Sequence, residues 1–308
     1  MLAAEQGLQV EAEMMKAEHA LEVHRCDLAI QIMQNLLRVY PEQNQAFVMM
    51  ARAYVMKREK QKAIQALKEA LRLDPEDDYA NALYGRLLGE EKQWEEAENA
   101  FQTALSIYPY HALTHLWYGF FLLSQHKTDQ AYHHAEVALE LDPEEEEAHI
   151  LMARILSEKG KLEQEEESLL QALRLAPDSY FTHFHYGLFL LTKKNERKKA
   201  FEYLREAIRM NPEDPELREV FLISLKAKNR VYGLFWSYSL FLHRFGKWKW
   251  GFIIGLYIMY RIVLYIARSS PDWAPFLIPI IVLYIVFCIF SWTADPLFNL
   301  FIRRGWIK

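Results

Sequence analysis

Residues 71–77 read LRLDPED, in which apolar residues form the last turn of a helix and Pro75 ends it, because proline lacks an N–H and clashes with the preceding turn. Near-copies of this stretch return along the chain: LRVYPEQ from Leu37, LSIYPYH from Leu105, LELDPEE from Leu139, LRLAPDS from Leu173 and IRMNPED from Ile208. Their prolines are Pro41, Pro75, Pro109, Pro143, Pro177 and Pro212, spaced by 34, 34, 34, 34 and 35 residues. A fixed period of this length indicates a repeat protein.

Small residues fall into register when these segments are aligned on their prolines, and they form three columns. The first column is Ala17, Ala51, Gly85, Gly119, Ala153 and Gly187; the second is Ala29, Ala63, Ala97, Ala131 and, one residue later, Ala200; the third is Ala70, Ala104, Ala138, Ala172 and Ala207. Large apolar residues lie beside the columns at spacings of three to four, so each unit is predicted to contain two amphipathic helices. Small residues at fixed points allow those helices to approach closely.

This pattern resembles the tetratricopeptide repeat, whose 34-residue unit has small residues at these places and a proline near its end. The resemblance covers about two thirds of the 308 residues. It implies an all-α fold, a helix-turn-helix solenoid of six repeats at about residues 10–43, 44–77, 78–111, 112–145, 146–179 and 180–214. Residues 215–230 are predicted to form a capping helix, because Leu217, Val220, Phe221 and Leu225 fall on one face and stacked repeats need covers at their ends.

Three positions depart from the repeat pattern. Leu36 replaces the small residue of the third column in repeat 1, which we interpret as a degenerate cap, and Glu165 replaces that of the second column in repeat 5. Repeat 6 carries one extra residue before Ala200, which we expect in the turn between its two helices. In the capping helix, Ser224 interrupts the apolar stripe and Leu222 and Ile223 lie off it, so the outer face is less polar than an ideal cap requires.

The distribution of charge divides the chain at about residue 230. Residues 231–308 contain eight Lys or Arg and two Asp, which leaves a net charge of −11 on residues 1–230.

Cys26 and Cys288 are the only cysteines, so neither a disulfide framework nor a CxxC metal site is available, and a reducing compartment is the simpler interpretation. The N-terminus lacks the basic start and apolar core of a secretory signal. We therefore expect residues 1–230 to stay in the cytosol.

Two apolar runs near the C-terminus predict a transmembrane helical hairpin. Residues 274–292 carry no charge and suffice to cross the hydrocarbon of a bilayer, whereas residues 251–267 are shorter and contain Arg261. Basic residues before the first run and after the second predict that both ends of the chain are cytoplasmic, as in a two-pass integral membrane protein in contact with the lipid bilayer. A buried hairpin of a soluble protein is the alternative.

Two features of this region each have two interpretations. Arg261 is an intramembrane charge, which either marks a functional site or reaches a headgroup from a tilted or shallow span. The aromatic segment 231–250 is too short to span a bilayer and too apolar for a solvated linker. It either lies in the membrane interface or packs, over residues 231–245, against the capping helix.

No pattern of catalytic or metal-binding residues emerges from the sequence. The chain has eleven histidines, but the pair His111 and His115 lacks the glutamate of an HExxH motif, and we interpret the histidines as lying at unrelated repeat positions. A Gly-rich phosphate loop and a GxSxG motif are absent from the sequence as well. We therefore expect no catalytic residue, no metal, no cofactor and no nucleic-acid partner.

The family that the sequence resembles exposes the ninth position of each first helix on a concave surface. By that resemblance, a partner-binding groove contains Arg52, Arg86, Phe120, Arg154 and Leu188. Guanidinium groups with apolar neighbours suit an acidic peptide with hydrophobic anchors. The other interpretation is that these arginines pair with nearby glutamates on the surface.

These observations favour a non-enzymatic, membrane-anchored adaptor or scaffold, which binds a protein or peptide partner in the groove of a cytosolic solenoid. The alternative is a regulatory or assembly subunit of a larger integral-membrane complex, contacted through the hairpin. An enzyme would require a site that forms between repeats.

Overall fold

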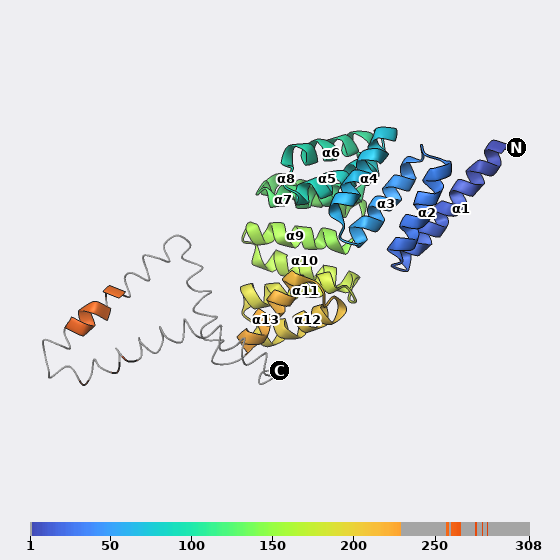
Figure 1. The fold of residues 1–308 in the computed structure, drawn as a ribbon. Coiled ribbons are helices and arrows are strands. Elements are labelled where there is room, and N and C mark those ends of the chain that lie inside the picture. Colours follow the sequence, from blue (N-terminus) through green and yellow to red (C-terminus); the bar gives the residue numbers. More distant parts are fainter. Residues whose placement is uncertain are drawn as a thin grey trace. The chain divides into compact units, whose positions relative to one another are not determined.

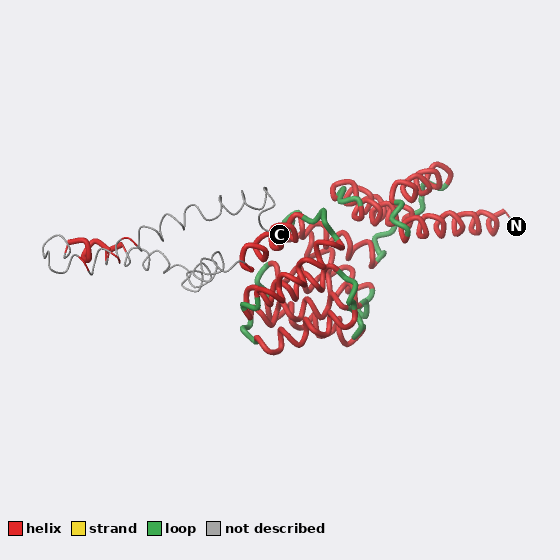
Figure 2. The backbone as a smooth tube through the Cα atoms, turned by 90° about the horizontal axis from the view of Figure 1, so that it is seen from below, coloured by secondary structure: helices red, strands yellow, loops and turns green. Residues whose placement is uncertain are grey.

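The computed structural model describes residues 2–228, 257–258, 260–265, 275, 279 and 282 (Figure 1). In this part of the chain the backbone consists of helices and connecting loops, without a strand (Figure 2). The prediction of an all-α fold is therefore confirmed. The chain divides into two compact units, Met1–Leu175 and Ala176–Lys308.

The first unit contains five helix pairs, each made of an A helix followed by a B helix (Figure 1). The pairs are α1 (Leu2–Glu22) with α2 (Cys26–Val39), α3 (Asn44–Met56) with α4 (Lys60–Leu73), α5 (Asp78–Glu90) with α6 (Trp94–Ile107), α7 (Ala112–Ser124) with α8 (Thr128–Leu141), and α9 (Glu146–Glu158) with α10 (Leu162–Leu175). Each A helix packs on the B helix of its own pair, and each B helix packs on the next A helix. This alternation is the predicted helix-turn-helix solenoid.

The columns of small residues lie where the helices meet. In the first unit, the alanines of all three columns are no more than 1% exposed. A methyl group added to Gly85 would lie 3.1 Å from the backbone oxygen of Ala97 in the second column, and 3.1 Å from the ring of Phe101. The B helix therefore passes too close to admit a larger side chain. The two departures in this unit, Leu36 and Glu165, are buried as well.

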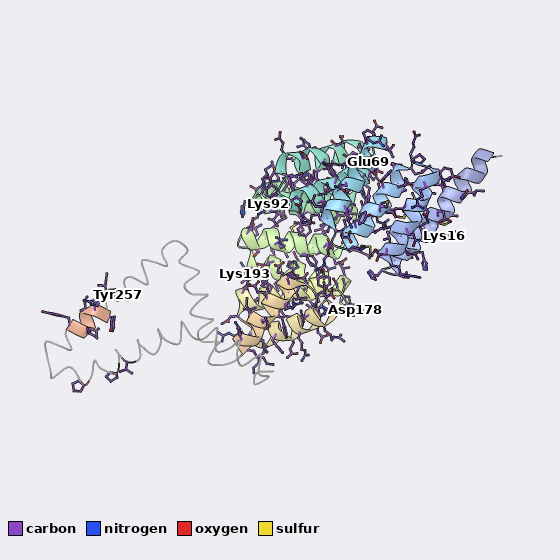
Figure 3. All side chains as sticks on the ribbon, viewed as in Figure 1. Lys16, Glu69, Lys92, Asp178, Lys193 and Tyr257 are labelled. Atoms are coloured by element: carbon purple, nitrogen blue, oxygen red, sulfur yellow. The ribbon has the colours of Figure 1, made fainter. Side chains whose placement is uncertain are left out.

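A residue with positive φ reverses the chain between the A and B helices of each pair in the first unit. These residues are His24, Arg58, Lys92, His126 and Gly160, with φ of 57°, 60°, 62°, 60° and 70°. In the turn that contains Lys92 (Figure 3), the N–H of Gln93 donates to the carbonyl of Leu88 at 2.9 Å, as in a Schellman motif. Glycine adopts such a φ with the least strain, but in four of the five turns another residue occupies this position.

The second unit begins with α11 (Tyr180–Phe189), the π-helical turn η1 (Leu190–Lys194) and α12 (Arg197–Met210). Asn195 has a φ of 56° and takes the place of the positive-φ residue. The N–H of Glu196 donates to the carbonyl of Leu190, six residues back instead of five. The extra residue of repeat 6 therefore widens the last turn of the A helix into a π-helix, and the prediction that it enlarges the following turn is wrong.

Helix α13 (Pro215–Lys228) packs on α12. Leu217 and Leu225 are buried, and the ring of Phe221 stacks on that of Phe201 with centroids 5.6 Å apart. Ser224 does not interrupt the buried face, because it is itself fully buried and its hydroxyl donates to the carbonyl of Phe221 at 2.7 Å. The contact surface of this helix therefore includes a small side chain whose hydroxyl forms its hydrogen bond within the same helix.

The predicted membrane segments lie mostly outside the described residues. The aromatic segment 231–250 is outside them entirely, as is the predicted span 274–292 except for residues 275, 279 and 282. In the predicted span 251–267, the described residues are helical, and Nη1 of Arg261 donates to the hydroxyl of Tyr257 at 3.2 Å, one helical turn earlier. Among the residues that the structure describes, none of the helices combines the length and hydropathy that a bilayer span requires.

Candidate partner-binding groove

The A helices of the first unit form the face on which the predicted groove residues lie. Helix α1 packs on α3, α5 packs on α7, and α7 packs on α9. Equivalent helices approach one another most closely on the inner side of a curved stack, so α1 with α3, and α5 with α7 and α9, lie on the inner side of their stacks.

Arg52, on α3, forms a bidentate ion pair with Glu18 on α1. Its Nη1 and Nη2 atoms donate to the two carboxylate oxygens at 2.6 and 2.7 Å. This hydrogen bonding raises the pKa of the Arg52 guanidinium, so the side chain stays charged and paired. The structure therefore matches the second interpretation for this arginine, in which a glutamate of the protein is its partner.

Arg86 and Arg154 instead lie over aromatic rings of α7. The guanidinium carbon of Arg86 is 5.1 Å from the ring centroid of Trp117, and that of Arg154 is 5.5 Å from the ring centroid of Phe120. A guanidinium over an aromatic face gains a cation–π attraction. Arg86 also forms an ion pair with Glu90, with 3.5 Å between Nε and Oε1, and its charge opposes the rise in the pKa of Glu147 that burial causes.

The structure thus brings the three arginines to one face of the first unit, where each contacts the A helix of an adjacent repeat. Phe120 belongs to the same face through its contact with Arg154. Leu188 lies on α11 in the second unit and is partly buried there. No contact of the described residues identifies the natural ligand of this surface, and the binding role of the five residues stays a prediction.

Sequence reasoning missed two aromatic residues of this face, Tyr79 and Trp117. Their ring centroids are 5.9 Å apart. Burial raises the pKa of Tyr79, while the nearby charges of Arg52 and Arg86 oppose that shift. The sequence contained a signal for both residues, because Tyr79 lies seven residues before Arg86 and Trp117 lies three before Phe120, which puts each pair on one helical face.

A cavity of about 530 Å³ opens near the N-terminal end of this surface. Its lining comes from α1, α3, the α4–α5 turn and the first turn of α5: Met14, Asn44, Gln45, Val48, Met49, Arg52, Asp74, Glu76, Asp77, Asp78 and Tyr79. The helices α3 and α5 make little contact with each other, unlike α7 and α9, which leaves room for the cavity. The amide of Asn44 donates to carboxylate oxygens of Asp74 and Asp77, both at 3.2 Å.

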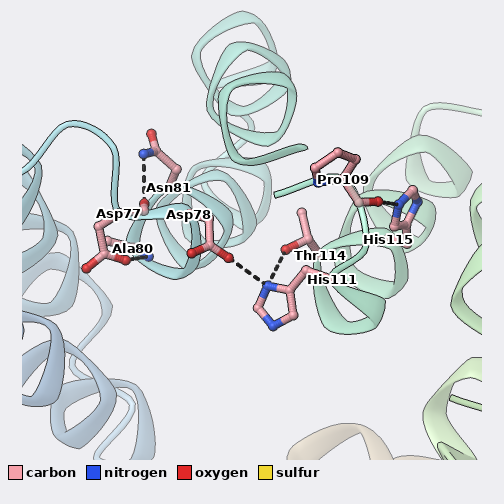
Figure 4. Close-up of polar contacts among 8 residues, drawn as sticks. All are labelled: Asp77, Asp78, Ala80, Asn81, Pro109, His111, Thr114 and His115. Atoms are coloured by element: carbon pink, nitrogen blue, oxygen red, sulfur yellow. Dashed lines mark hydrogen bonds and ion pairs between the residues drawn. The ribbon is translucent and has the colours of Figure 1, made fainter. Parts of the chain in front are cut away.

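Side chains of the A helices also form hydrogen bonds to the turns that contain the repeated prolines. Asn81 donates to the carbonyl of Pro75 at 2.9 Å, and Nε2 of His115 lies 3.0 Å from the carbonyl of Pro109 (Figure 4). The same contact joins His149 to Pro143 at 3.0 Å and, within the second unit, His183 to Pro177 at 2.7 Å. The interpretation that the histidines occupy unrelated positions is therefore wrong for these three, which share one repeat position.

His115 also contacts His134 of α8, with 2.8 Å between their Nδ1 atoms. A carbonyl can only accept, so Nε2 of His115 carries its hydrogen and donates to Pro109, and Nδ1 of His134 donates to Nδ1 of His115. Burial lowers the pKa of His134 to about 4, and His115 and His133 contribute to this shift. Over the described ranges, no group of three or more potential ligands could hold a metal ion.

Asp78 contacts His111 on the same surface. Its Oδ2 lies 3.1 Å from Nδ1 of His111, and the hydroxyl of Thr114 lies 3.0 Å from the same nitrogen (Figure 4). Asp77, the neighbouring residue, accepts a hydrogen bond from the N–H of Ala80 and so caps α5. The two adjacent carboxylates therefore have different partners.

Three solved structures are among those similar to this chain. The APC/C hetero-tetramer Cut9-Hcn1 aligns at a TM-score of 0.61 and 17% identity over 69% of this chain and 42% of that one. PilW, a type IV pilus biogenesis factor, aligns at 0.56 and 20% identity over 68% and 97%. A tetratricopeptide repeat protein from Parabacteroides merdae aligns at 0.60 and 14% identity over 69% and 83%. At these identities the likeness shows the fold alone.

Family models give a more direct assignment. Models of the tetratricopeptide repeat match residues 14–78, 59–115, 122–182 and 182–214, which together make up more than half of the chain. They describe a repeat scaffold for protein interaction and indicate no catalytic family. No curated protein is significantly similar to the chain in sequence. The chain therefore belongs to the tetratricopeptide repeat family.

Proposed function

We propose that the protein is a membrane-anchored adaptor that binds a protein partner along the A-helix face of its first unit. Stacking of Arg86 on Trp117 and of Arg154 on Phe120 supports this proposal. Tryptophan, tyrosine and arginine are the residues that most often carry binding energy in protein interfaces. A family fold that binds protein or peptide partners presents all three types on this one face.

The arrangement suits a peptide that carries an acidic residue next to apolar anchors. A guanidinium that lies over an aromatic ring can direct N–H groups away from the ring, where a carboxylate of the ligand can accept two hydrogen bonds. Arg86 is less fully paired than Arg52, because its ion pair with Glu90 involves Nε and has a length of 3.5 Å. Arg52 is the least available, because Glu18 already occupies both of its Nη atoms.

Partner capture by full-length variants tests this proposal. The partner is the protein that co-purifies with the wild-type chain from a detergent extract. The double substitution of Arg86 and Arg154 to Gln should reduce its recovery more strongly than Arg52→Gln does, while circular dichroism shows unchanged helicity. A charge-assisted hydrogen bond contributes about 1.5–3 kcal/mol. Substitution of Phe120 by Ala removes an apolar contact, so its effect should persist at high salt, whereas salt screens the arginine contacts.

Two results of this experiment would contradict the adaptor. If the arginine and Phe120 variants all recover the partner at the wild-type level, the A-helix face is not its binding site. If they do so while deletion of residues 251–308 loses the partner, the protein is a regulatory or assembly subunit that is contacted through its hairpin. Replacement of the hairpin by an unrelated anchor should preserve an adaptor and abolish assembly of a subunit.

Membrane anchoring is the second element of the proposal, and the sequence of residues 251–292 supports it. Two apolar runs flanked by basic residues predict a hairpin with both ends of the chain in the cytoplasm. A cysteine in place of Ser270, in a chain whose Cys26 and Cys288 are replaced by serine, should react with an impermeant maleimide from the far side of the membrane.

A cysteine in place of Ser106 provides the control for this labelling experiment. Ser106 is exposed on the first unit, whereas the natural Cys26 is buried and would resist the reagent on either side. The control should react only after the membrane is opened. If the Ser270→Cys variant is also labelled only after the membrane is opened, the proposed topology is wrong.

A further inference from the structure

The cavity beside α3 has an apolar floor and an acidic rim. Val48 and Met49 form part of its floor and are 8% and 9% exposed, so packing already fixes their positions. Its volume of about 530 Å³ is sufficient for one or two side chains of a ligand. Because α3 and α5 make little contact with each other, this space is part of the fold and not a gap left by one side chain.

The rim of the cavity carries an excess of negative charge. Asp74, Glu76, Asp77 and Asp78 contribute four carboxylates, against the single guanidinium of Arg52. That guanidinium is bound to Glu18 through both Nη atoms, so its charge is already matched.

The carboxylates of the rim have neutral partners or a histidine. Asn44 donates to Asp74 and Asp77 but carries no charge, and Asp78 faces His111. Within residues 2–228, Asp74, Glu76 and Asp77 form no ion pair with a lysine or arginine. Burial raises the pKa of Asp77, and the neighbouring charges of Asp74 and Asp78 raise it further. A cation in this cavity would relieve the repulsion among these groups.

We propose, building on the proposed function, that this cavity receives an arginine or lysine side chain together with an adjacent apolar residue of the partner peptide. The aliphatic stem of such a side chain would pack on Val48 and Met49, while its charged end would meet Asp74 and Asp77 at the rim. The ligand is therefore asymmetric. Its basic end lies over the cavity, and its acidic or apolar end lies over Arg86, Trp117 and Phe120.

The test uses the full-length protein in detergent and two fluorescein-labelled synthetic peptides. One peptide alternates arginine and leucine over nine residues, and the other has glutamine in place of arginine. Fluorescence anisotropy should show tighter binding of the arginine peptide to the wild-type protein, with detergent alone as the blank. Equal or tighter binding of the glutamine peptide would overturn the proposal.

A double substitution, Asp74→Asn with Asp77→Asn, removes two of the four negative charges of the rim. The side-chain oxygen of each asparagine can accept the capping hydrogen bond that the aspartate accepts now, whereas its amide group cannot accept the bond from Asn44, so circular dichroism checks the fold of this variant. Binding of the arginine peptide should weaken at least about tenfold, which corresponds to about 1.4 kcal/mol. Wild-type affinity in this variant would show that the cavity is not the site.

The turn between α8 and α9 offers a matched control. Asp142 and Glu145 occupy the repeat positions of Asp74 and Asp77, and they accept hydrogen bonds from the N–H groups of Glu144 and Glu147. There α7 packs directly on α9. The double variant Asp142→Asn, Glu145→Gln loses the same two charges and should bind the arginine peptide within about twofold of wild type. A loss equal to that of the cavity variant would show that only overall charge matters.

The natural partner separates failure of this inference from failure of the proposed function. If the Arg86 and Phe120 variants lose the partner while the cavity variant keeps it, the adaptor stands and the basic ligand is wrong. If the cavity variant alone loses the partner, the basic ligand stands and the arginine–aromatic part of the binding face is wrong.

Discussion

Replacement of Phe101 by Ala should uncouple the third repeat from the fourth. Phe101 lies on α6 and is fully buried. Its ring stacks on Tyr118 of α7 with centroids 5.1 Å apart, and it meets Phe121 of the same helix at 5.4 Å. It also faces Gly85 on α5, where an added methyl group would lie 3.1 Å from the ring. One side chain therefore holds helices of two repeats together.

The expected loss in the free energy of unfolding is about 3–5 kcal/mol, the usual range for a buried phenylalanine replaced by alanine. The upper part of this range applies, because two aromatic pairs are lost and each contributes about 0.5–1.5 kcal/mol beyond its buried area. The stability of a solenoid is a sum of repeats and their interfaces with nearest neighbours. A loss concentrated at one interface should therefore split unfolding into two steps.

Guanidinium denaturation of the full-length protein, followed by circular dichroism at 222 nm, measures this loss, and amide hydrogen exchange locates it. Exchange should accelerate in α6 and α7 more than in α1 and α2. Phe120→Ala is the control on the next A helix, because Phe120 is only partly buried and should cost about 1–2 kcal/mol. If Phe101→Ala loses no more stability than Phe120→Ala, or if exchange rises uniformly, the interface does not depend on this ring.

Three further measurements test other parts of the structure. Lys92→Gly should raise the free energy of unfolding by about 0.5–1 kcal/mol in chemical denaturation, because Lys92 has a φ of 62°, and a decrease would show that its conformation carries no strain. A double-mutant cycle on Arg52 and Glu18 should give a coupling of about 0.2–1 kcal/mol, since side chains 37% and 39% exposed are screened by water; a coupling above about 2 kcal/mol would contradict this. The pKa of His134 is lowered to about 4, so between pH 6.5 and 4 the unfolded chain binds more protons than the folded one. The free energy of unfolding should therefore fall as the pH is lowered through this window, by at most about 1.4 kcal/mol per unit, and His134→Gln should flatten the curve; an unchanged slope in that variant would reject the assignment.

The sequence alone predicted the repeat fold of this protein because the determinants of that fold are local. Each proline ends a helix within its own repeat, and each small residue permits a contact that recurs every 34 residues. The three columns are buried in the first unit as their spacing predicts. The membrane hairpin is likewise a prediction from local composition, and it concerns residues that the structure describes only in part.

The contacts of the candidate groove could be predicted only in part. The ninth position placed Arg52, Arg86 and Arg154 on one face, but not which groups would meet them. Arg52 pairs with Glu18, which lies 34 residues earlier, whereas Arg86 and Arg154 lie over aromatic rings of α7. Several partners lie within reach of such long side chains, so the distances between packed helices decide among them.

Tertiary structure alone also decided the cavity and the π-helical turn. The period treats all repeats as equivalent, and it therefore predicts the same distance between every pair of neighbouring A helices. In the structure, α3 and α5 make little contact while α7 and α9 pack together, which leaves the space beside Asn44. The extra residue of repeat 6 likewise entered the helix end and left the turn at Asn195 intact. A local pattern fixes which residues form each helix, whereas the spacing between helices depends on the packing of all side chains at their contacts.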